Sequence, residues 1–217
     1  MKLTKLAHAC VRLDKDGEAL VIDPGAFGGA EALDGAGAVL VTHEHFDHVE
    51  PDALRAAMTA NPGQRLWAPA PVAEQFADFG DRVRAVAHGD DFTAAGFTVN
   101  VYGEHHAVIH PDIPTVANVG FMVDGEIFHP GDSHTVPEDP VNTLLVPISG
   151  PWYSTREMID YARAVGPRRM FAIHDALLSP IGVSVAEMFA GLAAGRNNAS
   201  YTWVEPGSTV DLSPGAP

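Results

Sequence analysis

The sequence is poor in cysteine and has no long apolar run. Its 217 residues include one cysteine, Cys10, so an internal disulfide cannot form and a disulfide-stabilised secreted fold is excluded. No apolar stretch approaches the roughly 18 residues that a membrane-spanning helix requires. The N-terminal segment also lacks the apolar core of a signal peptide. We therefore expect a cytoplasmic protein without a membrane partner.

Basic residues are also scarce. The chain has 13 Lys and Arg against 28 Asp and Glu, which gives a formal net charge of −15. A surface this acidic repels the phosphates of nucleic acids and the anionic face of a membrane. We therefore expect no nucleic-acid partner and a small-molecule substrate instead. A homo-oligomer is compatible with this composition.

Short apolar segments alternate with turns rich in Gly, Pro and Asp. With 46% hydrophobic residues and no repeat or long linker, the chain is expected to form one domain over residues 1–217. Helices are expected at 51–60, 71–79, 154–165 and 184–194, the last two opening with Ser-x-x-Glu capping boxes. Strands are expected at 2–6, 10–13, 19–22, 38–41, 65–68, 97–102, 116–123, 126–128, 142–146, 168–173, 201–204 and 208–211. Strands dominate each half and each half ends in helices, which predicts a four-layer α/β arrangement of two sheets with helices outside.

Histidine is abundant, and its placement indicates metal binding. The 11 histidines are roughly twice the number usual for this length. The segment 42–48, Thr-His-Glu-His-Phe-Asp-His, directly follows the apolar strand expected at 38–41. In extended chain His43 and His45 point the same way and can share one metal ion, whereas Asp47 and His48 are offset and can face a second ion. Imidazole and carboxylate ligands suit zinc or another borderline divalent cation.

More distant residues are needed to complete such a site, because ligands from one loop do not enclose a metal ion. Three later places can supply them. His105 and His106 follow the strand expected at 97–102. Asp132 follows the hairpin strand at 126–128, and His174 follows the strand at 168–173. Each lies at the carboxyl end of a strand, where α/β enzymes collect their active sites.

These residues resemble the signature of the metallo-β-lactamase-fold superfamily of metal-dependent hydrolases. The segment 43–48 matches its His-x-His-x-Asp-His motif, Gly131-Asp132 is similar to its second Gly-Asp motif, and His174 is similar to its last histidine. The segments 6–9 and 19–24 resemble the branch that contains phosphorylated-ascorbate lactonases and N-acyl phosphatidylethanolamine phospholipase D. The resemblance covers about residues 3–175 and implies an αββα sandwich.

The resemblance implies a ligand set for two metal ions, with Asp132 as the bridge between them. The first ion would be bound by His43, His45 and a later histidine, and the second by Asp47, His48 and His174. The later histidine is His105 or His106, and the branch favours His106 because its ligand ends a short turn after the strand. Two divalent cations, Zn²⁺ with Mn²⁺ or Fe as alternatives, would hold a bridging hydroxide that attacks a carbonyl or phosphorus centre. Asp47 and Asp132 then count as catalytic residues.

Other residues near these motifs have two interpretations each. Asp23 either orients a ligand histidine by a hydrogen bond or forms a turn before Pro24. His8 lies either at the rim of the metal pocket or in an ordinary structural position. His110 and His134 lie on loops beside the expected ligands, so each is either a substrate contact and proton donor or a solvated loop residue. The pairs Trp152-Tyr153 and Leu177-Leu178 are candidates for the pocket walls.

We expect a dinuclear metal-dependent hydrolase that acts on a small uncharged or weakly charged ester, lactone or phosphoester. One alternative is a di-iron or mononuclear-iron redox enzyme with the same fold, and another is a metal-binding protein without catalysis. Di-iron reductases of this fold typically carry Glu at the position of His45 and need a flavin domain, which disfavours the first alternative. The complete ligand set disfavours the second. A transfer-RNA-processing nuclease shares the motif but does not suit a net charge of −15.

Overall fold

Two mixed β-sheets form the framework of the molecule. The computed structural model describes residues 1–213, so the last four residues of the domain expected over 1–217 lie outside the described part. The first sheet contains, in spatial order, β14 (Thr209–Asp211), β1 (Lys2–Lys5), β2 (Val11–Lys15), β3 (Glu18–Ile22), β4 (Ala38–Leu40), β5 (Arg65–Ala68) and β6 (Val83–Ala85). The second contains β13 (Ser200–Thr202), β12 (Arg169–Ile173), β11 (Thr143–Pro147), β10 (Ile127–His129), β9 (Gly120–Val123), β8 (Phe97–Tyr102) and β7 (Asp91–Ala94).

Each sheet changes strand direction partway across. β1, β2 and β3 are antiparallel neighbours, whereas β3 to β6 run parallel. In the second sheet β7 to β10 are antiparallel neighbours, and β10 to β13 run parallel. The carboxyl ends of the parallel strands therefore lie along one edge of each sheet, where α/β proteins place their ligand sites.

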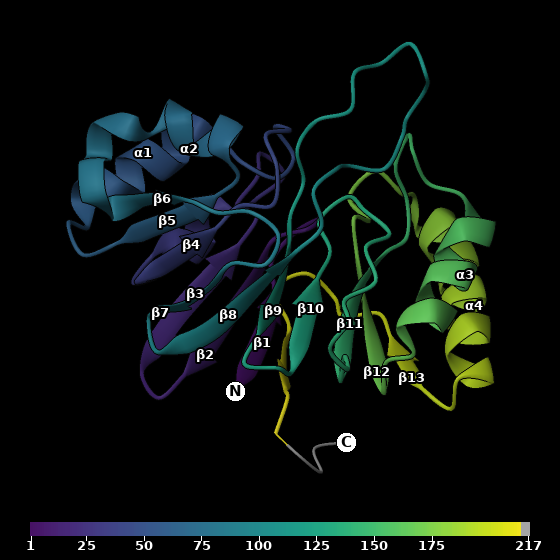
Figure 1. Ribbon diagram of the computed structural model, residues 1–217. Helices are drawn as coiled ribbons and strands as arrows, with labels where there is room; N and C mark the ends of the chain where they lie inside the picture. The colour runs from purple at the N-terminus through teal and green to yellow at the C-terminus, as the bar shows by residue number, and fades with distance from the viewer. Residues whose placement is uncertain (214–217) are drawn as a thin grey trace.

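Helices cover the outer faces of the two sheets (Figure 1). α1 (Pro51–Ala60) and α2 (Ala70–Gln75) lie beside the first sheet, and α3 (Thr155–Val165) and α4 (Pro180–Arg196) lie beside the second. Short 3₁₀ helices occupy Ala30–Leu33 (η1) and Ala77–Arg82 (η2). This helix–sheet–sheet–helix order confirms the expected αββα sandwich. Within residues 1–213, no helix has the length and apolar character needed to cross a bilayer.

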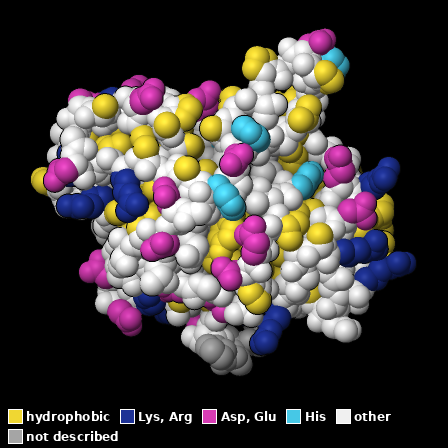
Figure 2. Space-filling view, viewed as in Figure 1, with side chains coloured by type: hydrophobic (Ala, Val, Ile, Leu, Met, Phe, Trp, Pro, Cys, Tyr) yellow, Lys and Arg dark blue, Asp and Glu magenta, His cyan; other side chains and the backbone are white. Residues whose placement is uncertain are grey.

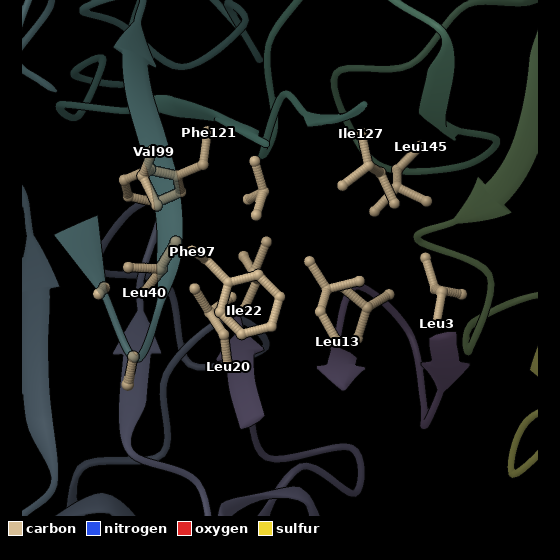
Figure 3. Packing of buried hydrophobic residues seen from close by; sticks show 14 of the residues in the cluster. Leu3, Leu13, Leu20, Ile22, Leu40, Phe97, Val99, Phe121, Ile127 and Leu145 are labelled. Carbon is tan, nitrogen blue, oxygen red and sulfur yellow. The ribbon is translucent and has the colours of Figure 1, made fainter. Parts of the chain in front are cut away.

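The two sheets pack face to face through apolar side chains (Figure 3). Leu20 of β3 and Leu40 of β4 belong to one buried cluster with Phe97 and Phe121 of the second sheet. Val39, between Ala38 and Leu40 on β4, belongs to a different cluster, on the helix side of the sheet. Because successive side chains of a strand point to opposite faces, the central strands are buried on both sides. They form a rigid base for the loops that follow them.

Two local signals in the sequence are confirmed by the structure. Ser154 caps α3, because its hydroxyl accepts a hydrogen bond from the N–H of Glu157 (3.2 Å) and donates one to the Glu157 carboxylate (2.7 Å). Asp124 and Gly125 form the tight turn between β9 and β10, with φ angles of 53° and 61°. Positive φ at both central residues is typical of a two-residue hairpin turn.

The expected start of α4 at Ser184 is wrong. The helix begins at Pro180, and Ser179 is its N-cap, with the hydroxyl accepting a hydrogen bond from the N–H of Gly182 (3.2 Å). Proline suits this first position because no N–H donor is needed there. Ser184 lies inside the helix instead, where its hydroxyl donates to the carbonyl of Pro180 (3.1 Å).

Three other segments differ from expectation. The helix expected at 71–79 ends at Gln75, and η2 follows it. The strand expected at 116–123 starts only at Gly120, because residues before it pair through one isolated bridge between His105 and Ala117. The sequence does not predict the edge strands β6 and β7, because they are only three and four residues long and expose part of their side chains.

Candidate metal centre

The loop after β4 turns sharply and presents four polar side chains. The N–H groups of His48 and Val49 both donate to the carbonyl oxygen of His45, at 2.9 and 3.0 Å. His43 and His48 are buried, whereas His45 and Asp47 are partly exposed. The turn therefore places two of these side chains deep in the molecule and two nearer to solvent.

Loops of the second sheet bring further side chains to the same place. His106 follows β8, Asp132 follows β10 and His174 follows β12, and all three are buried. Asp132 enters through a tight turn, because Gly131 has a φ of 62° and a Cβ at that position would stand 2.4 Å from Oδ1 of Asn118. The glycine of the Gly-Asp motif is thus required by space as well as by backbone conformation.

Eight side chains form two groups, and within each group the potential ligand atoms lie within 4.8 Å of one another. The groups are His43, His45, His106 and Asp132, and His8, Asp47, His48 and His174. Asp132 also borders the second group: its Oδ1 lies 3.0 Å from Nε2 of His48, and its Oδ2 lies 2.9 Å from Nε2 of His174. It stands between the two groups, where a carboxylate can bridge two cations. All seven residues expected as ligands lie in these groups.

Three of the histidines are held by hydrogen bonds from Nδ1, and Nε2 of one of them, His43, also lies 3.1 Å from Nδ1 of His45. Nδ1 of His48 donates to Asp23 (2.7 Å), and Nδ1 of His106 donates to the carbonyl of the next residue (2.6 Å). Nδ1 of His43 donates to the hydroxyl of Thr42 (3.0 Å). Each acceptor fixes a ring proton on Nδ1 and thereby turns Nε2 toward the cluster. Histidines that bind metal ions are oriented by partners of this kind.

Asp23 anchors this arrangement. Its carboxylate is fully buried and accepts hydrogen bonds from the backbone N–H and from the hydroxyl of Thr42, each at 2.7 Å, in addition to the one from His48. Asp23 thereby orients His48 directly and His43 through the Thr42 hydroxyl. The geometry agrees with both interpretations of Asp23, because its side chain orients His48 and its carbonyl accepts a hydrogen bond from the N–H of Gly25 (2.9 Å) in a turn around Pro24.

Several buried atoms of the cluster have no hydrogen-bond partner among the described residues. They are Nε2 of His48, Nε2 of His106, Oδ1 of Asp132 and both ring nitrogens of His174. His48 Nε2 and Asp132 Oδ1 approach to 3.0 Å, but without the angles of a hydrogen bond. Each buried polar atom without a partner costs about 1–3 kcal/mol. Imidazole nitrogens and carboxylate oxygens that converge in this way fit a divalent metal ion.

Buried charges determine the protonation of the second group. Burial alone lowers the pKa of His48, but the negative charges of Asp132 and Asp23 outweigh it and raise that pKa well above its usual value. Burial alone raises the pKa of Asp47, but the hydrogen bond from His8 and the charge of His48 lower it to about 2. A cation that binds Nε2 of His48 would replace the proton that these carboxylates favour.

His8 belongs to the second group by distance, but its hydrogen bonds run in the opposite sense. Its Nδ1 accepts a hydrogen bond from the N–H of Ala176 (3.2 Å), so the ring proton lies on Nε2 and is donated to Oδ2 of Asp47 (3.1 Å). Nε2 then offers no lone pair to a metal ion. The carbonyl of His8 also accepts a hydrogen bond from the N–H of His174 (3.0 Å). His8 thus holds two members of the group in place.

Two of the candidate residues lie away from the cluster. The side chain of His105 is 73% exposed and lies near Glu104, so the register after β8 brings His106 into the cluster and leaves His105 outside. The side chain of His110 is 61% exposed on the loop that protrudes between β8 and β9 (Figure 1). Its nearest charged neighbour is Asp112, on the same loop at 3.5 Å.

Trp152 covers the cluster from the loop after β11. Its indole N–H donates to Oδ2 of Asp132 (2.8 Å), and its ring centroid lies 5.9 Å from that of His106 and 5.4 Å from that of His134. His134, Ser133 and Trp152 line a polar pocket of about 390 Å³ beside the cluster. The sequence indicates Trp152 as a wall residue, but its contact with Asp132 has no signal in the sequence.

Comparisons with known proteins agree with this architecture. The family model described as "Beta-lactamase superfamily domain" matches residues 2–174. The chain is 38% identical over 186 residues to Protein Rv0786c of Mycobacterium tuberculosis, which covers 83% of this chain and 86% of that protein. The structure of Igni18, a metallo hydrolase from Ignicoccus hospitalis, matches with a TM-score of 0.74 at 19% identity and covers 96% of this chain and 97% of that chain.

A third match has a different activity in its name. CmlA from Streptomyces venezuelae, a diiron β-hydroxylase, matches with a TM-score of 0.67 at 14% identity and covers 96% of this chain and 53% of that chain. At such identities a structural match establishes the fold alone. The family model spans most of the chain, and together with the 38% identical relative it shows that the chain belongs to the β-lactamase superfamily.

Proposed function

We propose that the protein is a metal-dependent hydrolase that binds two divalent ions at this cluster. The observation that carries the proposal is the pair of ligand groups joined by Asp132, with buried ligand atoms that have no partner in the described part of the chain. Zn²⁺ is the preferred ion because histidine nitrogen supplies most of the ligands, with Mn²⁺ or Fe as alternatives. Igni18, which shares the fold, is named a metallo hydrolase, and this supports the reaction class.

Seven side chains would hold the two ions. The first ion would be bound by His43, His45, His106 and Asp132, and the second by Asp47, His48, His174 and Asp132. Divalent ions bound there supply Lewis-acid activation of water and polarisation of a carbonyl or phosphoryl oxygen. The chain itself keeps the ligands in register, because Asp23 orients His48 and His8 orients Asp47.

The substrate we propose is a small ester, lactone or phosphoester of little or no charge. The polar pocket beside Trp152 is lined by no Lys or Arg among the described residues. Figure 2 shows His and hydrophobic side chains together in the middle of one face, with Lys and Arg toward its edges. A strongly anionic substrate would need a basic clamp close to the cluster.

His134 is better placed than His110 to donate a proton to the leaving group. His134 lines the polar pocket next to Trp152, whereas His110 lies on the exposed loop. Replacement of His134 by Gln should slow hydrolysis of an ester with a poor leaving group by about a hundredfold and affect an activated ester little. Replacement of His110 by Gln serves as the matched control.

The test is a metal analysis of protein purified without added metal, followed by assays on chromogenic esters, lactones and phosphodiesters. We expect close to two ions per chain in the wild type and loss of the first ion and of activity in His106→Ala. The matched variant His105→Ala should retain both ions, because His105 lies outside the two ligand groups. Asp132→Ala should lower occupancy at both positions. One ion per fully active chain would overturn the dinuclear proposal, and iron without hydrolysis would favour a redox enzyme.

A further inference from the structure

An uncharged groove lies close to the cluster and shares no lining residue with the polar pocket. It has a volume of about 530 Å³ and runs between the segment after β11 and the first turns of α4. Its larger lining side chains are Ile148, Tyr153, Leu177, Leu178, Val185 and Phe189. No lining residue is charged. The two hollows therefore differ in chemistry, because the lining of one is largely polar and that of the other is largely apolar.

The groove approaches the cluster at Gly150, although no residue of the two ligand groups lines it. Gly150 lines the groove, and a Cβ at this glycine would stand 3.3 Å from Cε1 of His174 and 3.0 Å from Nε1 of Trp152. Trp152 in turn donates its indole N–H to Asp132. Gly150 thus lies between this end of the groove and two side chains, His174 of the candidate metal centre and Trp152.

The outer part of the groove exposes large apolar side chains. Leu177 is 62% exposed and Val185 is 49% exposed, although both are aliphatic. Exposed apolar surface around a concave site marks a place that an apolar ligand covers. An uncharged lining also excludes a carboxylate or phosphate from this side, because a desolvated charge there would find no partner.

We propose that this groove binds the acyl chain of the substrate, which makes the substrate a neutral ester or lactone of a medium-length aliphatic acid. The inference rests on the proposed hydrolase function and narrows its substrate class. Hydrolysis forms a bond between the water oxygen and the carbonyl carbon and breaks the bond to the alcohol oxygen. That oxygen takes up a proton. An ester then gives an aliphatic acid, on the groove side, and an alcohol, on the side of the polar pocket, whereas a lactone gives a single hydroxy acid.

A series of p-nitrophenyl esters from acetate to decanoate tests this assignment on the metal-loaded protein. Because each buried methylene strengthens binding about threefold to fourfold, kcat/KM should rise by that factor per methylene until the groove is filled. In the double variant Leu177→Asp/Val185→Asp, kcat/KM should increase much less with the length of the acyl chain. Met188→Asp is the matched control, because Met188 is a 61% exposed apolar residue of the same helix that does not line the groove. It should keep the wild-type slope.

A second readout does not depend on activity. The neutral fluorescent probe N-phenyl-1-naphthylamine should bind to metal-free wild type and to Met188→Asp, and at least tenfold more weakly to the double variant. Equal kcat/KM for all esters would overturn the acyl-groove assignment while the proposed hydrolase function stands. No metal-dependent hydrolysis of any ester would overturn the function itself. The double variant could also turn a wild-type dimer into a monomer and leave the dependence of kcat/KM on acyl-chain length unchanged. That result would overturn the assignment and identify the groove as an interface between two copies of the chain.

Discussion

Hydrogen-bond direction separates His8 from the histidines expected to bind metal. His48, His106 and His43 donate through Nδ1 and turn Nε2 toward the cluster, whereas His8 accepts through Nδ1 and donates through Nε2 to Asp47. His8 also adopts a left-handed backbone conformation, with a φ of 55°. Strain of this kind in a residue other than glycine is typical of functional sites. His8 is therefore a positioning residue of the second ligand group.

This role predicts a graded effect of substitution at His8. His8→Leu removes the donor to Asp47, and affinity for the second metal ion should fall tenfold to a hundredfold, the usual cost of losing such a support. His8→Gln keeps an N–H donor at a similar reach and should retain most of the affinity. Competition with a chromophoric chelator measures both variants without an activity assay. If both instead lose one ion completely, as expected for His48→Ala, His8 is itself a ligand.

The buried, neutral ring of His129 makes the free energy of unfolding depend on pH. Its Nε2 donates to the carbonyl of Ala9 (2.9 Å), and its Nδ1 accepts from the N–H of Gly131 (3.1 Å). Burial lowers its pKa, although Asp23 and the Ala9 carbonyl act in the opposite direction. Below pH 6.5 the unfolded chain therefore binds a proton that the folded chain does not, and the free energy of unfolding falls as the pH falls.

We expect His129→Gln to be less stable than wild type at pH 8 and to lose stability less steeply between pH 6.5 and pH 5. A single such group contributes a slope of at most about 1.4 kcal/mol per pH unit. Urea unfolding of the metal-free proteins measures both quantities. His105→Gln, at an exposed position, should keep the wild-type slope. An unchanged slope in His129→Gln would show that His129 becomes protonated in the folded state.

At the scale of elements, the start of α4 shows how two local signals compete. Ser179-Pro180 and Ser184-x-x-Glu187 are both helix-start patterns, and they lie five residues apart. The earlier one prevails, and the added turn brings Gly182 against Leu178, where a Cβ would stand 3.3 Å from the leucine side chain. Leu178 and Gly182 are four positions apart, so this contact is itself local and forms only when the helix starts at Pro180.

The two serines should therefore respond differently to substitution. Ser179→Ala removes the cap of the Gly182 N–H and should lower the free energy of unfolding by about 1 kcal/mol. Ser184→Ala removes a hydroxyl that bonds back to the Pro180 carbonyl inside the helix and should change stability little. Urea denaturation of both variants is the measurement. A larger loss of unfolding free energy in Ser184→Ala than in Ser179→Ala would mean that the helix starts at Ser184.

The separation of contacting residues along the chain explains which parts of the site the sequence could predict. The segment 43–48, Asp132 and His174 follow apolar strands, so alternation and strand ends brought them to one edge. The contacts of His8 with Asp47 and of Trp152 with Asp132 join residues 39 and 20 positions apart and depend on loop packing. The direction of each hydrogen bond depends further on neighbouring backbone groups, such as the N–H of Ala176. The hydrophobic periodicity of the sequence carries no information about these side-chain contacts or about the direction of these hydrogen bonds.

At the scale of the whole molecule, the candidate metal centre joins the two sheets. His43, His45, Asp47 and His48 follow β4 of the first sheet, whereas His106, Asp132 and His174 follow strands of the second. The apolar cluster between the sheets already holds them together. Ions bound at the edge would add a second link between the sheets, in the part of the molecule where unpartnered polar atoms are buried.

Metal removal should therefore lower the thermal stability of the entire fold. A ligand present at a hundred times its Kd stabilises the folded state by about 2.7 kcal/mol, which for a chain of this size corresponds to a Tm higher by roughly 5–10 °C. Scanning calorimetry with and without EDTA measures the shift. Asp132→Ala, which lacks the residue between the two ligand groups, should show little dependence of Tm on metal, whereas His105→Ala should behave as wild type. If EDTA removes the ions and the Tm of the wild type does not change, the ions bind the folded and unfolded chains equally well. The cluster would then not act as a second link between the two sheets.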